Sequence, residues 1–413
     1  GSSSASITGL SLSIATFFTF VNNSDQNGLY NLVFAGNDSI TGSSFSDSLT
    51  GYSGSNTING GDGDDVITTL GIDTIDGGAG IDSIFIDRSQ ISSPTALNLS
   101  GMTTNAGIAL ANGTSIRNVE AFDVTTGSGN DTLTFSGTLA GLNVFRGGAG
   151  SDRLVLDLSG TTIAWQTGFD RVTTSFGSPV LFMSAVETFD ITGGQAGDEL
   201  IGHLGNDTLS GGDGNDFIEG FRGDDNLNGG IGNDSLRGGA GVNTILGGVG
   251  DDEIIGGVLD GSGLTAVDQI DGGGGTDLLN LYYMATSANL TLSTAAMRTN
   301  EGAALGDGTI IRNVERVLQV LFGTGADNLI VDSALTGNVA YAGGGGVDRL
   351  TADLSPLGQA ISLSQATSRL DAGTFFVDFG AEEFYITGGS GADALTGADR
   401  NDVFAGNGGA DTL

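Results

Sequence analysis

Aspartate recurs every nine residues in the middle of this chain, among residue types that could bind a cation. The stretch SGGDGNDFIEGFRGDDNLNGGIGNDSLRGG (210–239) holds Asp216, Asp225 and Asp234, each preceded by a glycine-rich turn and followed two positions later by an aliphatic residue. Carboxylates together with glycine backbone carbonyls form an oxygen-only ligand set, which suits a hard divalent cation. Ca²⁺ accepts more numerous and less regular oxygen ligands than Mg²⁺ does, so calcium is the expected cofactor.

The nine-residue period defines three blocks of the chain. It is unbroken through 193–255, it occurs over 33–85 with a one-residue deletion, and it begins again at 388. A short fixed period is typical of a solenoid, in which each unit buries its core against its neighbours. In a nonapeptide such as GGDGNDFIE, the glycine-rich part forms a turn and the last three residues a strand with its middle side chain inward. Two nonapeptides make one coil, so aliphatic residues stack inside and Asp residues stack along both turn edges.

The charge of the chain requires a counterion. Asp and Glu number 49 against 13 Lys and Arg, for a net charge of −36. Two like charges about 5 Å apart repel by roughly 1 kcal/mol in water, and backbone ordering costs about 1–2 kcal/mol per residue. One aliphatic side chain per nonapeptide offsets little of this, so we expect multiple Ca²⁺ ions to stabilise the turns. The same charge argues against binding to nucleic acid or to an anionic membrane.

Several nonapeptides, among them GGDGDDVIT, GGDGNDFIE and GGVGDDEII, match the pattern G-G-x-G-x-D-x-U-x. The chain therefore resembles the RTX (repeats-in-toxin) family of calcium-binding proteins. The resemblance implies an all-β, right-handed parallel β-roll or β-helix solenoid that calcium stabilises after type I secretion. It also implies that the Asp at the sixth position of each repeat is a calcium ligand. These roles fall on Asp38, Asp47, Asp65, Asp73, Asp82, Asp131, Asp152, Asp198, Asp207, Asp216, Asp225, Asp234, Asp252, Asp277, Asp327, Asp348, Asp393, Asp402 and Asp411.

Some turns depart from the pattern. Asn56 and Asn243 stand where Asp is expected, so we expect weaker sites there or sites that rely on carbonyls. The repeats around Asp47 and Asn56 lack the second glycine, which makes the first sites doubtful. Additional acidic residues inside the turns are expected to face solvent rather than the ion: Asp62, Asp64, Asp213, Asp224 and Asp251.

A longer repeat is superimposed on the short one. DTIDGGAGIDSIFID at 73–87 recurs as DQIDGGGGTDLLNLY at 268–282, and IRNVE occurs at 116–120 and again at 311–315. We therefore expect about two copies of a unit near 195 residues, taken from a longer array. The expected segments are an N-terminal strand region (1–32), nonapeptide blocks (33–85 and 193–280), wide-coil segments (86–192 and 281–387) and a final nonapeptide block (388–413).

The two wide-coil segments carry isolated nonapeptide turns between stretches that alternate apolar and polar residues. LTLSTAAM and TTIAWQTGF are examples, and such alternation favours strands. We expect the same solenoid with wider coils and hairpin insertions, and no helix of substantial length. In the two IRNVE copies, Arg117 with Glu120 and Arg312 with Glu315 are expected to be surface pairs beside packed Ile and Val.

Catalysis is not expected in this chain. His203 is the single histidine, and we interpret it as a substitution at a turn position. One histidine cannot form an H-E-x-x-H motif, and no G-x-S-x-G motif is present. Glu187, Glu382 and Glu383 could pair as glycosidase carboxylates, yet any acidic solenoid offers such pairs by chance. There is no cysteine, so neither disulfides nor thiol chemistry contribute.

Two functions remain after these exclusions. The first is an extracellular structural or adhesive repeat protein, such as a stalk, a surface-layer component or a matrix component, secreted and associated with the cell surface. The alternative is a calcium-triggered secretion and folding segment of an enzyme whose catalytic domain lies elsewhere. Beyond calcium ions, cell-surface glycans and like subunits are the candidate partners, and Trp165, Phe169, Tyr282 and Tyr283 are candidate glycan contacts. No apolar run is long enough to predict membrane insertion.

Overall fold

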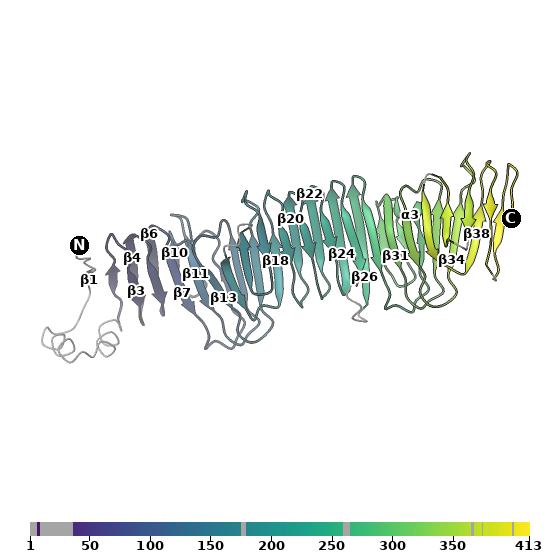
Figure 1. The fold of residues 1–413 in the computed structure, drawn as a ribbon. Helices are drawn as coiled ribbons and strands as arrows, with labels where there is room; N and C mark the ends of the chain where they lie inside the picture. The colour runs from purple at the N-terminus through teal and green to yellow at the C-terminus, as the bar shows by residue number, and fades with distance from the viewer. Residues whose placement is uncertain are drawn as a thin grey trace. The chain divides into compact units, whose positions relative to one another are not determined.

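The computed structural model describes residues 6–8, 36–174, 179–258, 265–364, 367–373, 375–398 and 400–413. The chain divides into two compact units, Gly1–Ile191 and Thr192–Leu413, which are described separately below. Within each unit, short, mostly parallel strands stack side by side as the rungs of a solenoid (Figure 1). The expected all-β roll is confirmed. Of the strand region expected at 1–32, only β1 (Ser6–Thr8) lies within the described residues.

The first unit begins with coils of two strands each. One sheet holds three parallel strands in register, with β1 antiparallel at its edge: β2 (Ser39–Thr41), β4 (Thr57–Asp62) and β6 (Thr74–Ala79). A second parallel sheet contains β3 (Ser48–Gly51), β5 (Val66–Thr69), β7 (Ser83–Asp87), β11 (Ala121–Thr125), β13 (Asn143–Arg146) and β17 (Pro179–Ser184). A third contains β8 (Ala96–Asn98), β12 (Thr132–Ser136), β14 (Arg153–Asp157) and β18 (Thr188–Thr192).

Antiparallel insertions interrupt the parallel stack of the first unit. β9 (Ile108–Ala109) pairs antiparallel with β10 (Ser115–Arg117), which itself continues the first sheet beside β6. β15 (Trp165–Thr167) and β16 (Arg171–Thr174) form a second antiparallel pair, and β16 also lies antiparallel to β17. The wider coils with hairpin insertions that the sequence predicts for 86–192 are therefore present.

The second unit repeats this plan. Its first sheet contains β20 (Thr208–Asp213), β22 (Asn226–Ile231), β24 (Gly241–Val249), β26 (Ala266–Gly274) and β30 (Ile310–Arg312), with β29 (Ala303–Ala304) antiparallel to β30. A second contains β19 (Glu199–Ile201), β21 (Phe217–Glu219), β23 (Ser235–Arg237), β25 (Glu253–Gly257), β27 (Leu278–Tyr282), β31 (Arg316–Leu321), β33 (Val339–Ala342) and β37 (Phe376–Gly380).

The remaining strands of the second unit belong to its wide coils and to the final nonapeptide block. An antiparallel insertion joins β35 (Ser362–Ser364) and β36 (Arg369–Asp371) to β37, and β39 (Ala394–Leu395) pairs with β35. The last parallel sheet contains β28 (Thr291–Ser293), β32 (Asn328–Asp332), β34 (Arg349–Asp353), β38 (Glu383–Thr387) and β40 (Val403–Ala405).

The core of the nonapeptide coils is a column of single aliphatic side chains. Thr208 of β20 pairs with Asn226 of β22, one coil apart, so residues at the same repeat position lie over one another. Leu209, Leu227 and Ile245 are fully buried along one sheet. A second column, from the facing strands, is also fully buried: Leu200, Ile218, Leu236 and Ile254. The inward column predicted from the nine-residue period is confirmed.

One local prediction is wrong in part. The alternation in LTLSTAAM (290–297) predicts a strand, but only Thr291–Ser293 is β28, and α3 (Thr294–Met297) is a single helical turn. The Ser293 hydroxyl accepts a hydrogen bond from the Ala296 N–H at 3.3 Å, which caps this turn. Two alanines and a methionine are strong helix formers, and they override the alternating pattern here.

Candidate functional site

The sixth-position Asp residues of the nonapeptides form hydrogen-bonded ladders along the turn edges. The Asp198 N–H donates to Asp216 Oδ1 at 2.7 Å, and the Asp216 N–H donates to Asp234 Oδ1 at 2.8 Å. The contact repeats from Asp234 to Asp252 and from Asp252 to Asp277. Each carboxylate thus accepts a hydrogen bond from a backbone N–H of the preceding coil, and this contact orients the Asp side chain.

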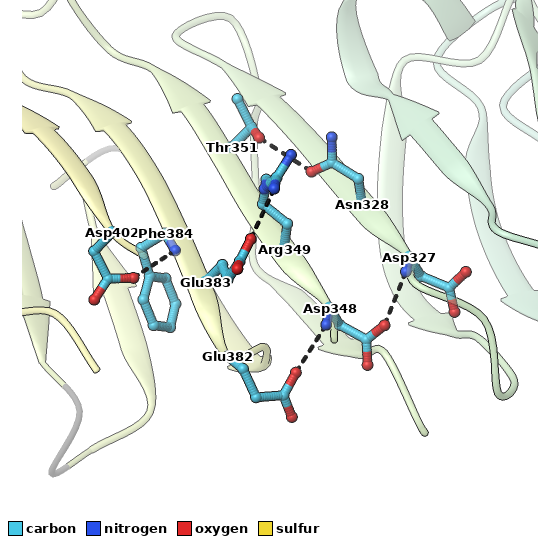
Figure 2. Close-up of polar contacts among 9 residues, drawn as sticks. All are labelled: Asp327, Asn328, Asp348, Arg349, Thr351, Glu382, Glu383, Phe384 and Asp402. Carbon is cyan, nitrogen blue, oxygen red and sulfur yellow. Dashed lines mark hydrogen bonds and ion pairs between the residues drawn. The ribbon is translucent and has the colours of Figure 1, made fainter. Parts of the chain in front are cut away.

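The same ladder recurs at every other group of predicted residues. In the second unit, the Asp207 N–H donates to Asp225, and the Asp327 N–H donates to Asp348 (Figure 2). In the first unit it links Asp47 to Asp65, Asp65 to Asp82, and Asp131 to Asp152. Near the end of the chain, the Asp393 N–H donates to Asp411, whereas Asp402 accepts from the Phe384 N–H.

Among the described residues, nothing donates a hydrogen bond to the second carboxylate oxygen of most ladder Asp side chains. These side chains are buried, with 6% or less of their surface exposed, and their Oδ2 atoms are buried and unpartnered in the protein. A buried oxygen without a partner costs about 1–3 kcal/mol, and more when it is charged. The ladder residues in this state are Asp38, Asp65, Asp82, Asp152, Asp216, Asp225, Asp234, Asp252, Asp277, Asp327 and Asp348.

At five of these residues the unpartnered oxygen lies in a cradle, a small space shared by the first glycine of its own turn and the carbonyl of a glycine one coil later: Asp65, Asp216, Asp225, Asp234 and Asp252. A Cβ atom on Gly211 would overlap both Asp216 Oδ2 and the carbonyl oxygen of Gly229, one coil later. The next residue, Gly212, has a φ of 103° and approaches the Gly194 carbonyl of the preceding coil equally closely. Glycine is therefore required twice in the turn, once for space and once for its left-handed backbone. The cradle brings a carboxylate oxygen and a backbone carbonyl oxygen to the same small space.

The electrostatics of the cradle are unfavourable to the ionised carboxylate alone. Burial raises the pKa of Asp216, Asp225 and Asp252 to about 7, although the backbone N–H bond that each accepts lowers it. Burial likewise raises the pKa to about 6 at Asp82, Asp277 and Asp327. The described residues contain no ion pair between an arginine and any of these carboxylates. The part of the chain that the structure describes therefore supplies no positive partner for these carboxylates.

This donor set fits a calcium ion. The ligands it offers are all oxygens, they combine carboxylate with backbone carbonyl, and they belong to successive coils, as Ca²⁺ coordination permits. Nowhere among the described residues do three His, Cys, Asp or Glu side chains gather as a metal cluster. Each site would therefore depend on few carboxylates and on backbone carbonyls, which explains the density of glycine in the turns.

The two Asn positions in the ladders form a different arrangement. Asn56 Nδ2 donates to Asp73 Oδ1, and Asn243 Nδ2 donates to Asp268 Oδ1, both at 2.9 Å. The amide nitrogen lies close to the first glycine of its own turn, where Asp repeats place Oδ2. The Thr69 hydroxyl also donates to Asp73 Oδ2, at 2.7 Å. An internal hydrogen-bond donor thus occupies the cradle in both copies of the longer repeat.

Asp268 is a ladder residue that the sequence interpretation missed. It is fully buried, and it accepts hydrogen bonds from Asn243, from the Tyr283 hydroxyl at 2.6 Å and from the Gly257 N–H. An insertion before β26 moves it off the nine-residue period. The alignment of DQIDGGGGTDLLNLY with DTIDGGAGIDSIFID pairs it with Asp73, and that signal was sufficient to find it.

At several predicted residues Oδ2 does accept a hydrogen bond from the turn of the same repeat. Asp47 accepts from the backbone N–H and hydroxyl of Ser43, which agrees with the doubt over the first turns. His203 lies at the turn position predicted for it, and its backbone N–H donates to Asp207 Oδ2. The other residues with such a contact from the turn are Asp131, Asp198, Asp393 and Asp402.

The additional acidic residues lie outside the cradles, as expected. Asp62, Asp64, Asp213, Asp224 and Asp251 are all exposed. Three of them, one position before the ladder Asp, accept a backbone N–H from the next coil: Asp64, Asp224 and Asp251. Exposed Asn residues make the same contact elsewhere, for example between Asn215 and the Asn233 N–H. These exposed Asp and Asn side chains, one position before each ladder residue, form an outer ladder. It links successive turns by hydrogen bonds that do not require a charge.

The expected pairing within the IRNVE motifs is wrong. Arg117 forms an ion pair with Asp76 at 2.6 Å, and Arg312 with Asp271 at 2.7 Å, rather than with Glu120 and Glu315. The parallel pairing of β10 with β6 places Arg117 directly beside Asp76, a neighbour that local spacing does not reveal. Ile116, Val119, Ile311 and Val314 are buried, so the predicted packing of these side chains is confirmed.

The glutamates of these motifs instead continue the Asp ladders. Glu120 Oε2 accepts the Asp82 N–H, and Glu315 Oε2 accepts the Asp277 N–H, each at 2.9 Å. Glu187 and Glu382, considered above as glycosidase carboxylates, make the same contact with Asp152 and Asp348. Sequence reasoning missed this role because these residues do not follow the nine-residue period.

Two of the aromatic residues considered for glycan contact belong to the core. Trp165 is fully buried and its indole N–H donates to the Thr161 hydroxyl at 2.8 Å, and Tyr283 is 4% exposed. These two side chains cannot contact a glycan from inside the solenoid. Within the described residues, no helix is long and apolar enough to cross a membrane.

Comparison with known proteins agrees with the geometry of the ladders. The family model of the RTX calcium-binding nonapeptide repeat (4 copies) matches residues 34–67, 68–85, 192–227, 201–236, 219–254 and 386–413. No curated protein matches the chain. The fold and the repeats define a calcium-binding repeat solenoid. The matched stretches of the chain are RTX calcium-binding nonapeptide repeats, and they coincide with the blocks in which the ladders run in nine-residue register.

Proposed function

We propose that this chain is an extracellular structural or adhesive repeat protein that folds and stiffens when calcium binds along its Asp ladders. The observation that carries the proposal is the row of buried carboxylate oxygens without donors. At five of them a glycine carbonyl of the neighbouring coil borders the same space, which a Cβ atom cannot enter: Asp65, Asp216, Asp225, Asp234 and Asp252. At Asp82, Asp152 and Asp277 the neighbouring carbonyl belongs to a residue other than glycine. A divalent cation in each cradle would supply the missing partner and the missing charge together.

Calcium binding would make folding depend on the compartment. A ligand that binds only the folded state raises stability with the logarithm of its free concentration over the dissociation constant. Many coupled sites add their contributions, so the transition is steep. The chain would stay extended at the low calcium concentration inside a cell and fold outside it, where calcium is abundant.

The exact reuse of contacts in the two copies of the longer repeat favours a structural function. Arg117 and Asn118 both contact Asp76, and Arg312 and Asn313 both contact Asp271 in the same way. Tandem copies with the same internal contacts build length rather than a single active centre. We therefore favour a stalk, surface-layer or matrix component over a segment that only assists secretion of an enzyme.

The test is a calcium titration of the 413-residue chain by calorimetry or equilibrium dialysis, with two matched variants. Asp216→Asn keeps the ladder hydrogen bond but removes the charge from the cradle, and Asp213→Asn removes an equal charge from an exposed turn position. We expect several ions per chain, a clear loss of affinity in Asp216→Asn and almost none in Asp213→Asn. Equal loss in both variants, or no calcium binding by the parent chain, would contradict the proposal.

A further inference from the structure

Four glutamates occupy the ladder position one coil after a buried Asp. Glu120, Glu187, Glu315 and Glu382 accept the backbone N–H of Asp82, Asp152, Asp277 and Asp348 respectively, at 2.8–2.9 Å. This is the contact that Asp Oδ1 makes within the nonapeptide blocks. Figure 2 shows it for Glu382, which follows Asp348 just as Asp348 follows Asp327.

In three of the four cases, a backbone carbonyl accompanies the glutamate. Asn118, Ala185 and Asn313, each two residues before the glutamate, adopt a left-handed backbone with φ of 50–52°. A Cβ atom on Gly77 would overlap both the Asn118 carbonyl oxygen and Asp82 Oδ2, as it would with a glycine carbonyl in a nonapeptide turn. The carbonyls of Ala185 and Asn313 take the corresponding positions beside Asp152 and Asp277.

The Asp residue in each of these four places still has a free oxygen. Asp82, Asp152, Asp277 and Asp348 are at most 1% exposed, and their Oδ2 atoms are buried without a hydrogen-bond partner. At Asp82, Asp152 and Asp277, Oδ2 and the neighbouring carbonyl therefore form the same cradle as in the nonapeptide coils. The second carboxylate comes from a glutamate whose segment breaks the nine-residue period.

We propose that these glutamates are further calcium ligands, so that the three-residue segments 118–120, 185–187 and 313–315 act as compact half-sites. Each replaces the six-residue glycine-rich turn, with its left-handed residue in place of the first glycine and its glutamate in place of the Asp. Glu382 provides the same carboxylate at a fourth place. The inference rests on the proposed function, because it assumes that the neighbouring cradles bind calcium.

A comparison within the chain distinguishes a ligand from a simple hydrogen-bond acceptor. Where the ladder Asp has its oxygens satisfied internally, as at Asp73 and Asp268, the next coil offers a neutral hydroxyl, from Thr114 and Thr309. At Asp82, Asp152, Asp277 and Asp348, each of which has an unpartnered oxygen, the next coil offers a glutamate. A second negative charge beside a buried carboxylate is unfavourable unless a cation compensates it, and all four of these glutamates lie beside such an unpartnered oxygen.

The decisive variant is the quadruple substitution Glu120→Gln, Glu187→Gln, Glu315→Gln and Glu382→Gln, which keeps the amide-accepting oxygen and removes the charge. Equilibrium dialysis at fixed free calcium should show about one fewer ion per substituted glutamate. The matched control is Glu301→Gln, an exposed glutamate outside the ladders, which should bind as the parent chain does. A quadruple variant that binds the parental number of ions with unchanged affinity overturns the inference.

Single variants keep the test decisive if the quadruple variant does not fold. In Glu315→Gln, the calcium concentration at which the segment 310–321 is half protected from hydrogen exchange should be roughly tenfold higher than in the parent chain, because the number of charged ligands sets the affinity. An unchanged midpoint relative to Glu301→Gln overturns the inference and leaves the proposed function intact. Absence of calcium binding by the parent chain removes the proposed function as well, so the two failures are distinguishable.

Discussion

The nonapeptide coils and the wide coils share one hydrogen-bonded ladder but differ in the core behind it. In the nonapeptide coils over 193–255, the inward columns take one aliphatic side chain from each strand, such as Leu209 or Ile218, and β25 also buries Ile255. In the wide coils of the first unit, Phe122 and Phe135 are fully buried with ring centroids 5.7 Å apart, and Phe145 is fully buried as well. The apolar area buried per coil is therefore larger where the coil is wider.

This difference implies that the two regions depend on calcium to different degrees. Burial of aromatic side chains contributes much of the stability in most cores, and the wide coils also contain ion pairs such as Arg146 with Asp123. The nonapeptide coils have little besides backbone hydrogen bonds and the small aliphatic column. We expect cation binding to supply the remaining free energy of folding in the nonapeptide coils. In the wide coils, we expect side-chain packing to supply more of the free energy of folding.

The largest expected effect is the response of the calcium-free chain to pH. Burial holds the pKa of Asp216, Asp225 and Asp252 at about 7, above the usual range of an unfolded Asp. A protonated carboxyl group is neutral and can be buried without a counterion. These three groups therefore stabilise the folded state fully below about pH 4, and this stabilisation is lost as the pH rises through 7. In chelator, strand content by circular dichroism should therefore increase as pH falls from 8 to 5.

In excess calcium the pH dependence should reverse, because protons then compete with the bound ion for the same carboxylates. Acidification from pH 8 to 5 should release calcium and lower the thermal unfolding temperature. The same pH dependence with and without calcium would show that the ladder carboxylates are not the ligands.

The next effect in size separates packing from metal binding in the wide coils. Phe122→Ala should lower the free energy of unfolding of its segment by about 3–5 kcal/mol, because it leaves a cavity in a fully buried position. Phe45→Ala, at a side chain that is 58% exposed, is the control and should change little. Denaturant unfolding at saturating calcium measures both. A silent Phe122→Ala would mean that calcium alone holds the wide coils.

A smaller effect is expected where the ladder carries asparagine. Asn243→Asp replaces an amide that donates to Asp268 with a carboxylate that repels it. The calcium-free chain should lose about 1–3 kcal/mol, and folding of 193–255 should require more calcium. Asn215→Asp, at an exposed outer-ladder position, keeps its accepting oxygen and serves as the control. If both variants fold at the same calcium concentration, the amide does not substitute for a cation.

Much of the fold follows from the nine-residue period alone. The period fixes which aliphatic residue points inward and which Asp lies on the turn edge, because residues such as Leu209 and Leu227 are repeated at each coil in parallel register. The period predicts that Asp side chains stack along the turn edge, but it does not predict the hydrogen bond from the Asp216 N–H to Asp234. That bond depends on how closely successive turns stack.

The parts of the ladder that escaped prediction lie where the period breaks. Asp268 follows an insertion, and Glu120 and Glu315 take their places through a left-handed residue two positions earlier. The partner of Arg117 lies 41 residues away on the adjacent strand, so no local spacing could identify it. Contacts between successive coils of unequal length require the structure.

Hydrogen exchange with and without calcium measures how far the nonapeptide coils depend on the ion for their fold. Amides of 193–255 should exchange freely in chelator and become protected together as calcium is added, with magnesium a poor substitute. Segments of the wide coils, such as 121–136, should keep part of their protection in chelator. If 193–255 is as protected in chelator as in calcium, then the buried carboxylates need no cation and the account of a calcium-dependent fold is contradicted.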